Sequence, residues 1–264
     1  MTDDVIRKSV GGRKPAEYYL QKAVEYEDAG LFMNAIGALE KAARASSDKA
    51  PIYKDLGELY RSQRMIDEAI STTRKAIQLK PDDIPTREFL IEILIELAMF
   101  DDAIHESQEL LRYSPRSLSA RDVLSIAYLQ KGMLEKALQV TNELINLDPT
   151  SPANHFKKAI LFQQKGDIGN AINEFGRVLN MHPDDDMAED AQEAIETLDS
   201  HQLRHIVMLA VEDYIFRTKL IRDPETAATE RGYIMSESGM ATLKQIQFEE
   251  LPEIFTEWKQ RYYH

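Results

Sequence analysis

Residues 51–81 read PIYKDLGELYRSQRMIDEAISTTRKAIQLKP, and this stretch decides the fold. Its first half places apolar or small residues at positions i, i+3, i+4 and i+7, namely Tyr53, Leu56, Gly57 and Tyr60. This spacing is the apolar stripe of an amphipathic α-helix. A second stripe runs from Ile66 to about Leu79, and Pro81 then ends the helix because proline has no N–H to donate. The stretch therefore predicts two helices joined by a tight turn.

The same pattern recurs along the chain with a fixed 34-residue period. An alanine marks each copy, at Ala35, Ala69, Ala103, Ala137 and Ala171. Nine residues before each alanine stands a large apolar residue, at Tyr26, Tyr60, Leu94, Tyr128 and Phe162. Twelve residues after the last four alanines stands a proline, at Pro81, Pro115, Pro149 and Pro183. Alanine suits a helix crossing, because a bulkier side chain would push the two axes beyond the usual ~8–10 Å.

This periodic pattern resembles the tetratricopeptide repeat (TPR), a 34-residue helix–turn–helix unit. The copies start near residues 16, 50, 84, 118 and 152, and the second copy matches the family pattern best. Arg87, Arg121 and His155 replace the usual first aromatic residue in three copies. The resemblance implies an all-α fold with five repeats in a superhelical array. Gly30, Gly132 and Gly166 fall at the turn between the two helices, where a positive φ is easy for glycine.

Beyond Pro183 we expect a capping helix, Met187 to Leu198, which begins after the acidic residues 184–186. The 34-residue period stops at about Asp199, and a separate long helix is expected from His201 to Ile221. The domain organisation that follows has three parts: a flexible N-terminal segment (1–14), a TPR array with its capping helix (15–198) and a small C-terminal helical module (199–264). Terminal repeats need such a cap to cover their last apolar face.

The C-terminal module carries two further patterns. Residues 212–243, with Asp223-Pro224 in the middle, loosely resemble the helical leader-like segments of nitrile-hydratase-related peptide precursors. That resemblance implies a docking element, although the chain lacks the double-glycine cleavage site of such precursors. Near the end, Phe255, Trp258 and Tyr262 form an aromatic stripe on a short helical pattern. So short a helix is marginal alone, so we expect the stripe to dock on another surface.

Composition excludes several classes of function. The 264 residues include no Cys, which removes disulfides, thiolate metal sites and thiol nucleophiles. The formal net charge is −13, so nucleic acid and anionic membranes are poor partners. No apolar run approaches the length of a membrane span, and the segment 1–14 lacks the apolar core of a secretory signal. We therefore expect a cytoplasmic protein whose acidity is concentrated in residues 15–198.

Catalytic motifs are missing from the sequence. It contains no Gly-rich phosphate loop, no GxSxG and no HExxH pattern. His201 and His205 have the i, i+4 spacing of a helical metal pair, but no third ligand is evident, and two histidines on a helix are usually surface or packing residues. The expectation is a protein that is not an enzyme, with no catalytic residues, no metal site and no cofactor.

In the TPR resemblance, one face of each first helix lines a concave groove. Transferred to this sequence, that face holds Leu20, Val24 and Glu27 in the first copy. The residues expected to bind a partner there are Lys54, Glu58, Arg61, Glu88, Glu92, Asp122, Ile126, Leu129, Phe156, Ile160 and Gln163. The face changes from acidic in the first three copies to apolar in the last two. Two simpler explanations stay open: the C-terminal module covers the apolar residues, and the acidic residues are only solvated surface.

The sequence thus favours a non-enzymatic scaffold or adaptor that holds a basic or amphipathic segment of a protein or peptide partner in the groove. Charge placement would set specificity and apolar anchors would set affinity. A first alternative is a self-associating structural protein, a homo-oligomer in which the C-terminal aromatic stripe docks in a groove. A second alternative is an accessory subunit of a peptide- or protein-modifying enzyme, which depends on the leader-like resemblance.

Overall fold

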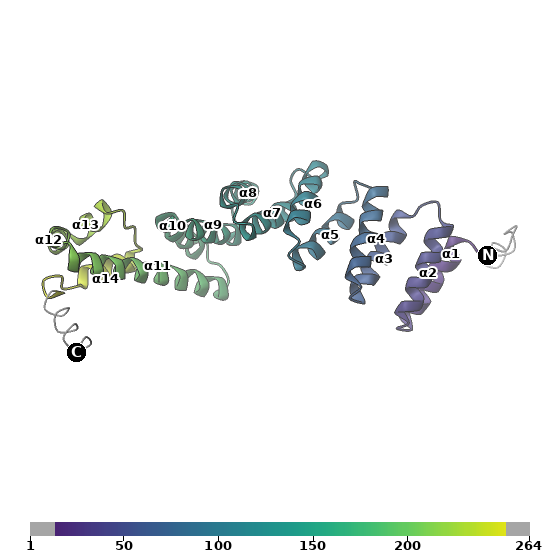
Figure 1. The fold of residues 1–264 in the computed structure, drawn as a ribbon, viewed down its shortest axis with the longest axis horizontal. Coiled ribbons are helices and arrows are strands. Elements are labelled where there is room, and N and C mark those ends of the chain that lie inside the picture. The colour runs from purple at the N-terminus through teal and green to yellow at the C-terminus, as the bar shows by residue number, and fades with distance from the viewer. Residues whose placement is uncertain (1–13, 252–264) are drawn as a thin grey trace. The chain divides into compact units, whose positions relative to one another are not determined.

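The structure is a computed structural model that describes residues 14–251. Within these residues it contains fourteen α-helices and no strand, which confirms the all-α class (Figure 1). The chain divides into two compact units at residues 131/132, and each unit is described by itself. No helix of the described residues is long and apolar enough to cross a membrane.

The first unit contains seven helices. Their bounds are α1 Ala16–Asp28, α2 Phe32–Ala45, α3 Ala50–Ser62, α4 Ile66–Leu79, α5 Ile84–Glu96, α6 Phe100–Tyr113 and α7 Leu118–Gln130. The second unit contains α8 Leu134–Leu147, α9 Pro152–Lys165, α10 Ile168–Asn180, α11 Asp185–Glu212, α12 Tyr214–Arg222, α13 Pro224–Glu230 and α14 Glu237–Gln245. The helices α1 to α10 follow the 34-residue period, so the predicted helix–turn–helix repeats are confirmed.

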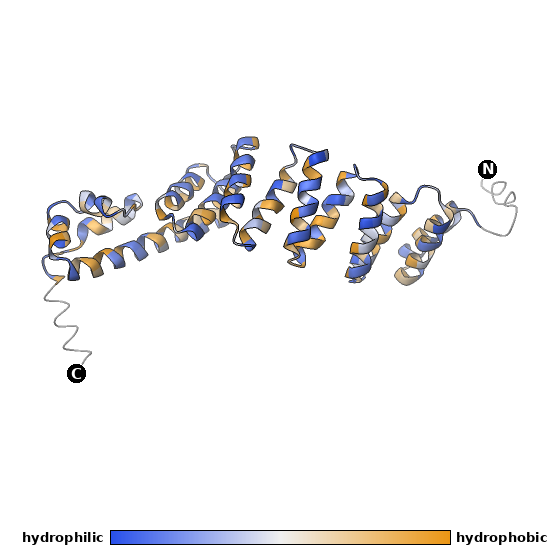
Figure 2. Ribbon diagram, turned by 45° about the horizontal axis from the view of Figure 1, so that its top comes forward, coloured by the Kyte–Doolittle hydropathy of each residue, from blue (hydrophilic) through white to orange (hydrophobic). Residues whose placement is uncertain are grey.

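The periodic alanines lie where the helices of each unit pack together. Ala35, Ala69 and Ala103 in the first unit, and Ala137 and Ala171 in the second, all have 0% of their surface exposed. The helices carry apolar residues beside polar ones (Figure 2). One continuous core cluster joins α1 to α6 of the first unit, from Ala23 to Ala103. The small side chains at the crossings allow this close approach.

The turn between the two helices of each repeat requires a left-handed residue. Gly30, Gly132 and Gly166 occupy it with φ of 70°, 69° and 79°. In the second and third copies the same place is taken by Arg64 with φ of 60° and Ala98 with φ of 55°. A side chain in this conformation costs roughly 1–2 kcal/mol. Two of the five turns are therefore strained.

We expect Ala98→Gly to raise the free energy of unfolding by about 0.5–1 kcal/mol, because glycine removes the left-handed strain but costs some chain entropy. Urea denaturation measures the change. Ala29→Gly is the matched control, since Ala29 ends α1 with φ of −85° and has no strain to release. That control should lose stability. A loss for Ala98→Gly as well would show that the turn at Ala98 is not strained.

Arg87 and His155, which replace the usual aromatic residue in copies three and five, each contact a glutamate on the next helix. In the third copy the Arg87 guanidinium bonds the carboxylate of Glu106 on the next helix, and both side chains are largely buried. In the fifth copy His155 Nδ1 lies 2.7 Å from Glu174 Oε2 in the corresponding place. In these two copies the place of the aromatic residue is thus taken by a polar pair that joins the two helices of one repeat.

Glu174 is the centre of a charged cluster inside the second unit. Lys158 Nζ lies 3.1 Å and Arg177 Nη1 3.4 Å from its Oε1. Burial alone would raise the pKa of Glu174, but the hydrogen bonds from His155 and Lys158, with the charges of Lys158 and Arg177, hold that pKa below its ordinary value. The carboxylate therefore stays ionised in the interior, as a buried charge must when it has partners.

The structure corrects the expected break after Leu198. Residues 185–212 form one helix of 28 residues, α11, because no glycine or proline interrupts them. Its first half packs on α9 and α10 through Ala191, Ile195 and Leu198. Its second half, with Ile206 and Ala210, forms the core of the C-terminal helices. The chain turns only at Asp213, whose Oδ1 accepts the N–H of Phe216 at 2.9 Å to cap α12.

The C-terminal helices are attached to α11 by buried polar contacts. The amide of Gln202 donates to Ile234 O at 2.8 Å and accepts from Ile234 N at 3.1 Å. Asp199 Oδ1 accepts the N–H of Ser236 at 3.0 Å, and its other oxygen accepts the Ser236 hydroxyl. The residues that resemble a leader segment lie here in α12, α13 and α14, and their resemblance stays a prediction. The expected stripe of Phe255, Trp258 and Tyr262 lies outside the described residues.

Candidate functional site

A hollow of about 500 Å³ opens between α1 and α3 of the first unit. Leu20, Val24 and Glu27 line it from α1, where the spacing i, i+4, i+7 places them on one face. Asp55, Glu58 and Ser62 line it from α3 with a similar helical spacing. Of the residues expected on the first-helix face in the first two copies, Leu20, Val24, Glu27 and Glu58 line this hollow, and Lys54 and Arg61 do not.

The floor of this hollow is apolar and open to solvent. Val24 is 58% exposed and Phe32, at the start of α2, is 39% exposed. Leu20 and Leu59 continue the floor toward the core of the unit. Large apolar side chains that share an exposed concave surface usually mark a contact with another molecule. The floor therefore offers anchoring positions for an apolar side chain.

The rim of the hollow is acidic. Partial burial, with the neighbouring carboxylates of Asp55 and Asp28, raises the pKa of Glu27. Partial burial likewise raises the pKa of Asp55, against the charge of Lys54. Lys54 Nζ lies 3.9 Å from Glu58 Oε1, a loose pair that is largely exposed to solvent. Burial removes part of the solvation of these carboxyl groups and so raises their pKa values. A cation placed among them would stabilise their ionised form.

The same face continues along α5 and α7 of this unit. Arg61 on α3 donates to Glu92 on α5 at 3.2 Å and also bonds Glu96. Its guanidinium lies 5.2 Å from the ring centre of Phe89. Glu88 on α5 accepts the hydroxyl of Ser119 on α7 at 2.6 Å. The structure thus brings together Arg61, Glu88 and Glu92, although Arg61 already neutralises part of the acidity.

The remaining predicted groove residues are only partly exposed to solvent. Asp122, Ile126 and Leu129 of α7 are half-buried in the first unit. Phe156, Ile160 and Gln163 of α9 are half-buried in the second unit. Phe156 and Ile160 pack against the core cluster of α10 and α11, and the ring centres of Phe156 and Phe175 lie 5.4 Å apart in an edge-to-face arrangement. As binding residues all six stay predictions, and the hollow between α1 and α3 is the better candidate site.

The structure also places the residues with possible metal chemistry. His205 Nδ1 lies 2.7 Å from the hydroxyl of Tyr233, with which it stacks edge to face. His201 lines a neighbouring hollow of about 340 Å³. Among residues 14–251, no three His, Cys, Asp or Glu side chains are grouped so that they could hold a metal ion. His205 thus contacts Tyr233, and the absence of a metal site stays a prediction.

Residues 20–84 match the family model described as "Tetratricopeptide repeat". The fold resembles the solved structure of YrrB, described as "a TPR protein with an unusual peptide-binding site", with a TM-score of 0.59 and 19% identity, over 72% of this chain and 97% of that one. It also resembles MamA from Desulfovibrio magneticus RS-1, with a TM-score of 0.54 and 18% identity, over 66% of this chain and 97% of that one. A comparison with curated proteins finds no match. These findings confirm the helical-repeat fold predicted from the 34-residue period and, for residues 20–84, the tetratricopeptide repeat itself.

Proposed function

We propose, from the premise that this chain is built of tetratricopeptide repeats, that it is a cytoplasmic, non-enzymatic adaptor whose groove holds a basic, amphipathic segment of a partner protein. The TPR fold is typical of protein-interaction scaffolds, and one of the similar structures is described as having a peptide-binding site. The observation that carries the proposal is the hollow between α1 and α3, where an open apolar floor has a rim of carboxylates.

The occupant follows from the chemistry of this hollow. An apolar side chain of the partner would cover Val24 and Phe32, which are the most exposed apolar residues of the floor. A lysine or arginine of the partner would lie between Glu27 and Asp55, whose raised pKa values indicate that these carboxyl groups lack solvation. Apolar anchors dominate the affinity of such interfaces, while charge complementarity sets specificity and association rate.

The hollow is large enough to hold side chains of a ligand. Its volume of about 500 Å³ lies within the ~300–1,000 Å³ usual for binding pockets. Adjacent first helices α3 and α5 add the pairs of Arg61 with Glu92 and Glu96 to the same face. A longer segment would extend from the apolar floor toward these residues. Glu92 and Glu96 then present a second acidic position, at which a partner cation competes with Arg61.

The test is the variant Val24→Lys with a labelled synthetic peptide of alternating lysine and leucine, measured by fluorescence anisotropy. The substitution removes the apolar floor and adds a repelling charge, so we expect at least about tenfold weaker binding, which corresponds to ~1.4 kcal/mol. Helical circular dichroism should stay unchanged, because the Val24 side chain is already more than half exposed.

Leu79→Lys is the matched control. Leu79 is 55% exposed at the end of α4 and does not line the hollow. It adds the same charge to the same unit, so any general repulsion of the peptide appears in both variants. Equal affinities for Val24→Lys and Leu79→Lys would contradict the groove as the binding site.

A further inference from the structure

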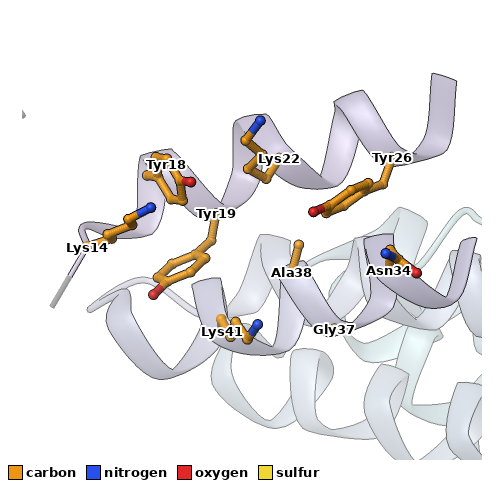
Figure 3. Close-up of a pocket in the computed structure, with 9 residues that line it drawn as sticks. All are labelled: Lys14, Tyr18, Tyr19, Lys22, Tyr26, Asn34, Gly37, Ala38 and Lys41. Carbon is orange, nitrogen blue, oxygen red and sulfur yellow. The ribbon is translucent and has the colours of Figure 1, made fainter. Parts of the chain in front are cut away.

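A second hollow, of about 450 Å³, lies on a different surface of the first repeat (Figure 3). Lys14 precedes α1, Tyr18, Tyr19, Lys22 and Tyr26 belong to α1, and Asn34, Gly37, Ala38 and Lys41 belong to α2. These nine lining residues include three lysines and three tyrosines but no carboxylate. The hollow is therefore basic in a chain whose net charge is −13.

The repeat register shows that this face is normally an internal one. One turn of the first helix carries Tyr18 in copy one and the buried residues Ile52, Thr86, Ala120 and Asn154 in the later copies. The next turn carries Lys22 in copy one and the buried leucines Leu56, Leu90 and Leu124 in copies two to four. In the first copy this face carries the half-buried Tyr18 and Lys22, and copy five also has a lysine at the second position, Lys158.

The charges of the hollow are only partly neutralised. Lys22 bonds Glu25 on the same helix, three residues away. Lys14 Nζ lies 3.7 Å from the ring centre of Tyr18, which is a cation–π contact and not an ion pair. Lys41 makes no ion pair with any residue of the described chain. A ligand in the hollow therefore meets ammonium groups from three places on the chain.

The basic groups come from separate parts of the first repeat. Lys14 stands before α1, Lys22 lies on α1 and Lys41 lies on α2. A peptide segment with several acidic side chains can offer each ammonium group a carboxylate of its own. Gly37 has no side chain to fill the floor of the hollow, and the Ala38 side chain beside it is a single methyl group.

We propose that this basic, tyrosine-lined hollow binds an acidic peptide segment of a partner protein. Aspartate or glutamate side chains of the segment pair with Lys14, Lys22 and Lys41, and its backbone lies across the rings of Tyr18, Tyr19 and Tyr26. The hollow between α1 and α3 is acidic and takes a ligand of the opposite charge. The first repeat then presents two sites of opposite sign, so that one adaptor joins a basic and an acidic segment.

The alternative is a polar cap that only keeps the open end of the repeats in solution, as terminal repeats require. A cap has no need for a concave surface or for glycine in the middle of α2. A Cβ atom added at Gly37 would meet nothing within 4 Å. Glycine inside a helix costs roughly 0.5–1 kcal/mol relative to alanine, and packing does not require it here.

The test uses the full chain and a labelled synthetic octapeptide of alternating glutamate and glycine, titrated by fluorescence anisotropy at low salt. Gly37→Leu fills the floor of the hollow and should reduce affinity at least tenfold while thermal stability stays equal or rises. Lys41→Glu reverses one charge and should reduce affinity at least tenfold as well. Raising the salt concentration should weaken binding to the wild type.

Lys75→Glu is the matched control, because Lys75 stands one repeat period after Lys41, at the same position on α4, and does not line the hollow. Lys75→Glu should leave the affinity for the acidic peptide unchanged. Val24→Lys should also leave it unchanged, because Val24 lines the α1–α3 hollow and not this one. Absence of binding to the wild type at millimolar peptide would overturn the proposal in favour of a polar cap. Tighter binding of a single-stranded oligonucleotide than of the peptide, or equal losses for Lys41→Glu and Lys75→Glu, would overturn it too.

Discussion

Arg87→Ala is expected to lower the free energy of unfolding of the first unit by about 3–5 kcal/mol, the usual cost of removing one partner of a buried ion pair. The guanidinium bonds Glu106 and also donates to the carbonyl of Pro81 at 3.2 Å. Only 6% of the Arg87 side chain and 12% of the Glu106 side chain are exposed. The variant leaves the Glu106 carboxylate buried without its partner. Urea denaturation followed by circular dichroism measures the loss.

Two further variants show whether the buried pair is the cause. Arg74→Ala removes a pair with Asp102 that has a good distance, 3.0 Å, but is 40% and 44% exposed. Exposed pairs contribute at most about 1 kcal/mol, so this control should change little. The double variant Arg87→Tyr with Glu106→Thr installs the residues that copy two has at these positions, Tyr53 and Thr72. It should recover most of the stability, whereas equal losses for Arg87→Ala and Arg74→Ala would rule out this account.

Gly239→Val is expected to release α14 from α11 in the second unit. A Cβ atom at Gly239 would lie 2.4 Å from the carboxyl carbon of Asp199. Asp199 has little freedom to move away, because both its oxygens accept hydrogen bonds from Ser236. Overpacking usually costs about 1–3 kcal/mol, and loss of the Asp199 contacts adds the cost of unsatisfied polar groups. Limited proteolysis should therefore cut the chain near α14 at a protease concentration that leaves the wild type intact.

Gly176→Val provides the matched control for this experiment. Gly176 lies inside α10 of the same unit, and a Cβ atom there meets nothing within 4 Å. The same substitution should thus be tolerated and leave the proteolysis pattern unchanged. Resistance of Gly239→Val equal to that of Gly176→Val would mean that Asp199 and Gly239 do not hold α14 in place.

The repeats could be predicted from the sequence because their signals are local and periodic. Each alanine at 34-residue spacing is buried at a helix crossing. The extent of α11 could not be predicted from the repeat. The period ends at Asp199, but the end of a sequence repeat does not end a helix when neither proline nor glycine follows.

The sequence showed which copies lack the usual aromatic residue, but it did not show which residues contact the replacements. Arg87 and His155 each pair with a glutamate on the following helix, and partners so far apart along the sequence are not recognisable as a contact without the fold. The basic hollow was missed for a related reason. Lys22 stands where three later copies have leucine, so comparing the copies position by position would have indicated it.

The candidate groove was predicted in part. Repeat positions indicated Leu20, Val24, Glu27 and Glu58 as residues of one face, and the structure places all four around the same hollow. Asp55, Phe32 and Ser62 also line it, although the pattern did not select them. Their contribution depends on how closely neighbouring helices approach, which a repeat pattern describes only on average.

The long helix α11 has a consequence for how the second unit comes apart. In a repeat array each unit is stabilised chiefly by its neighbours, so the last unit normally frays first. Here Ile195 of α11 belongs to the core of the last repeat and Ile206 to the core of the C-terminal helices. The last repeat cannot unfold from its end without breaking α11, and α11 also contributes to the core of the C-terminal helices. Opening of the two cores is therefore linked, and amide protons of α9 and α10 should exchange through a cooperative event in place of stepwise loss from the end.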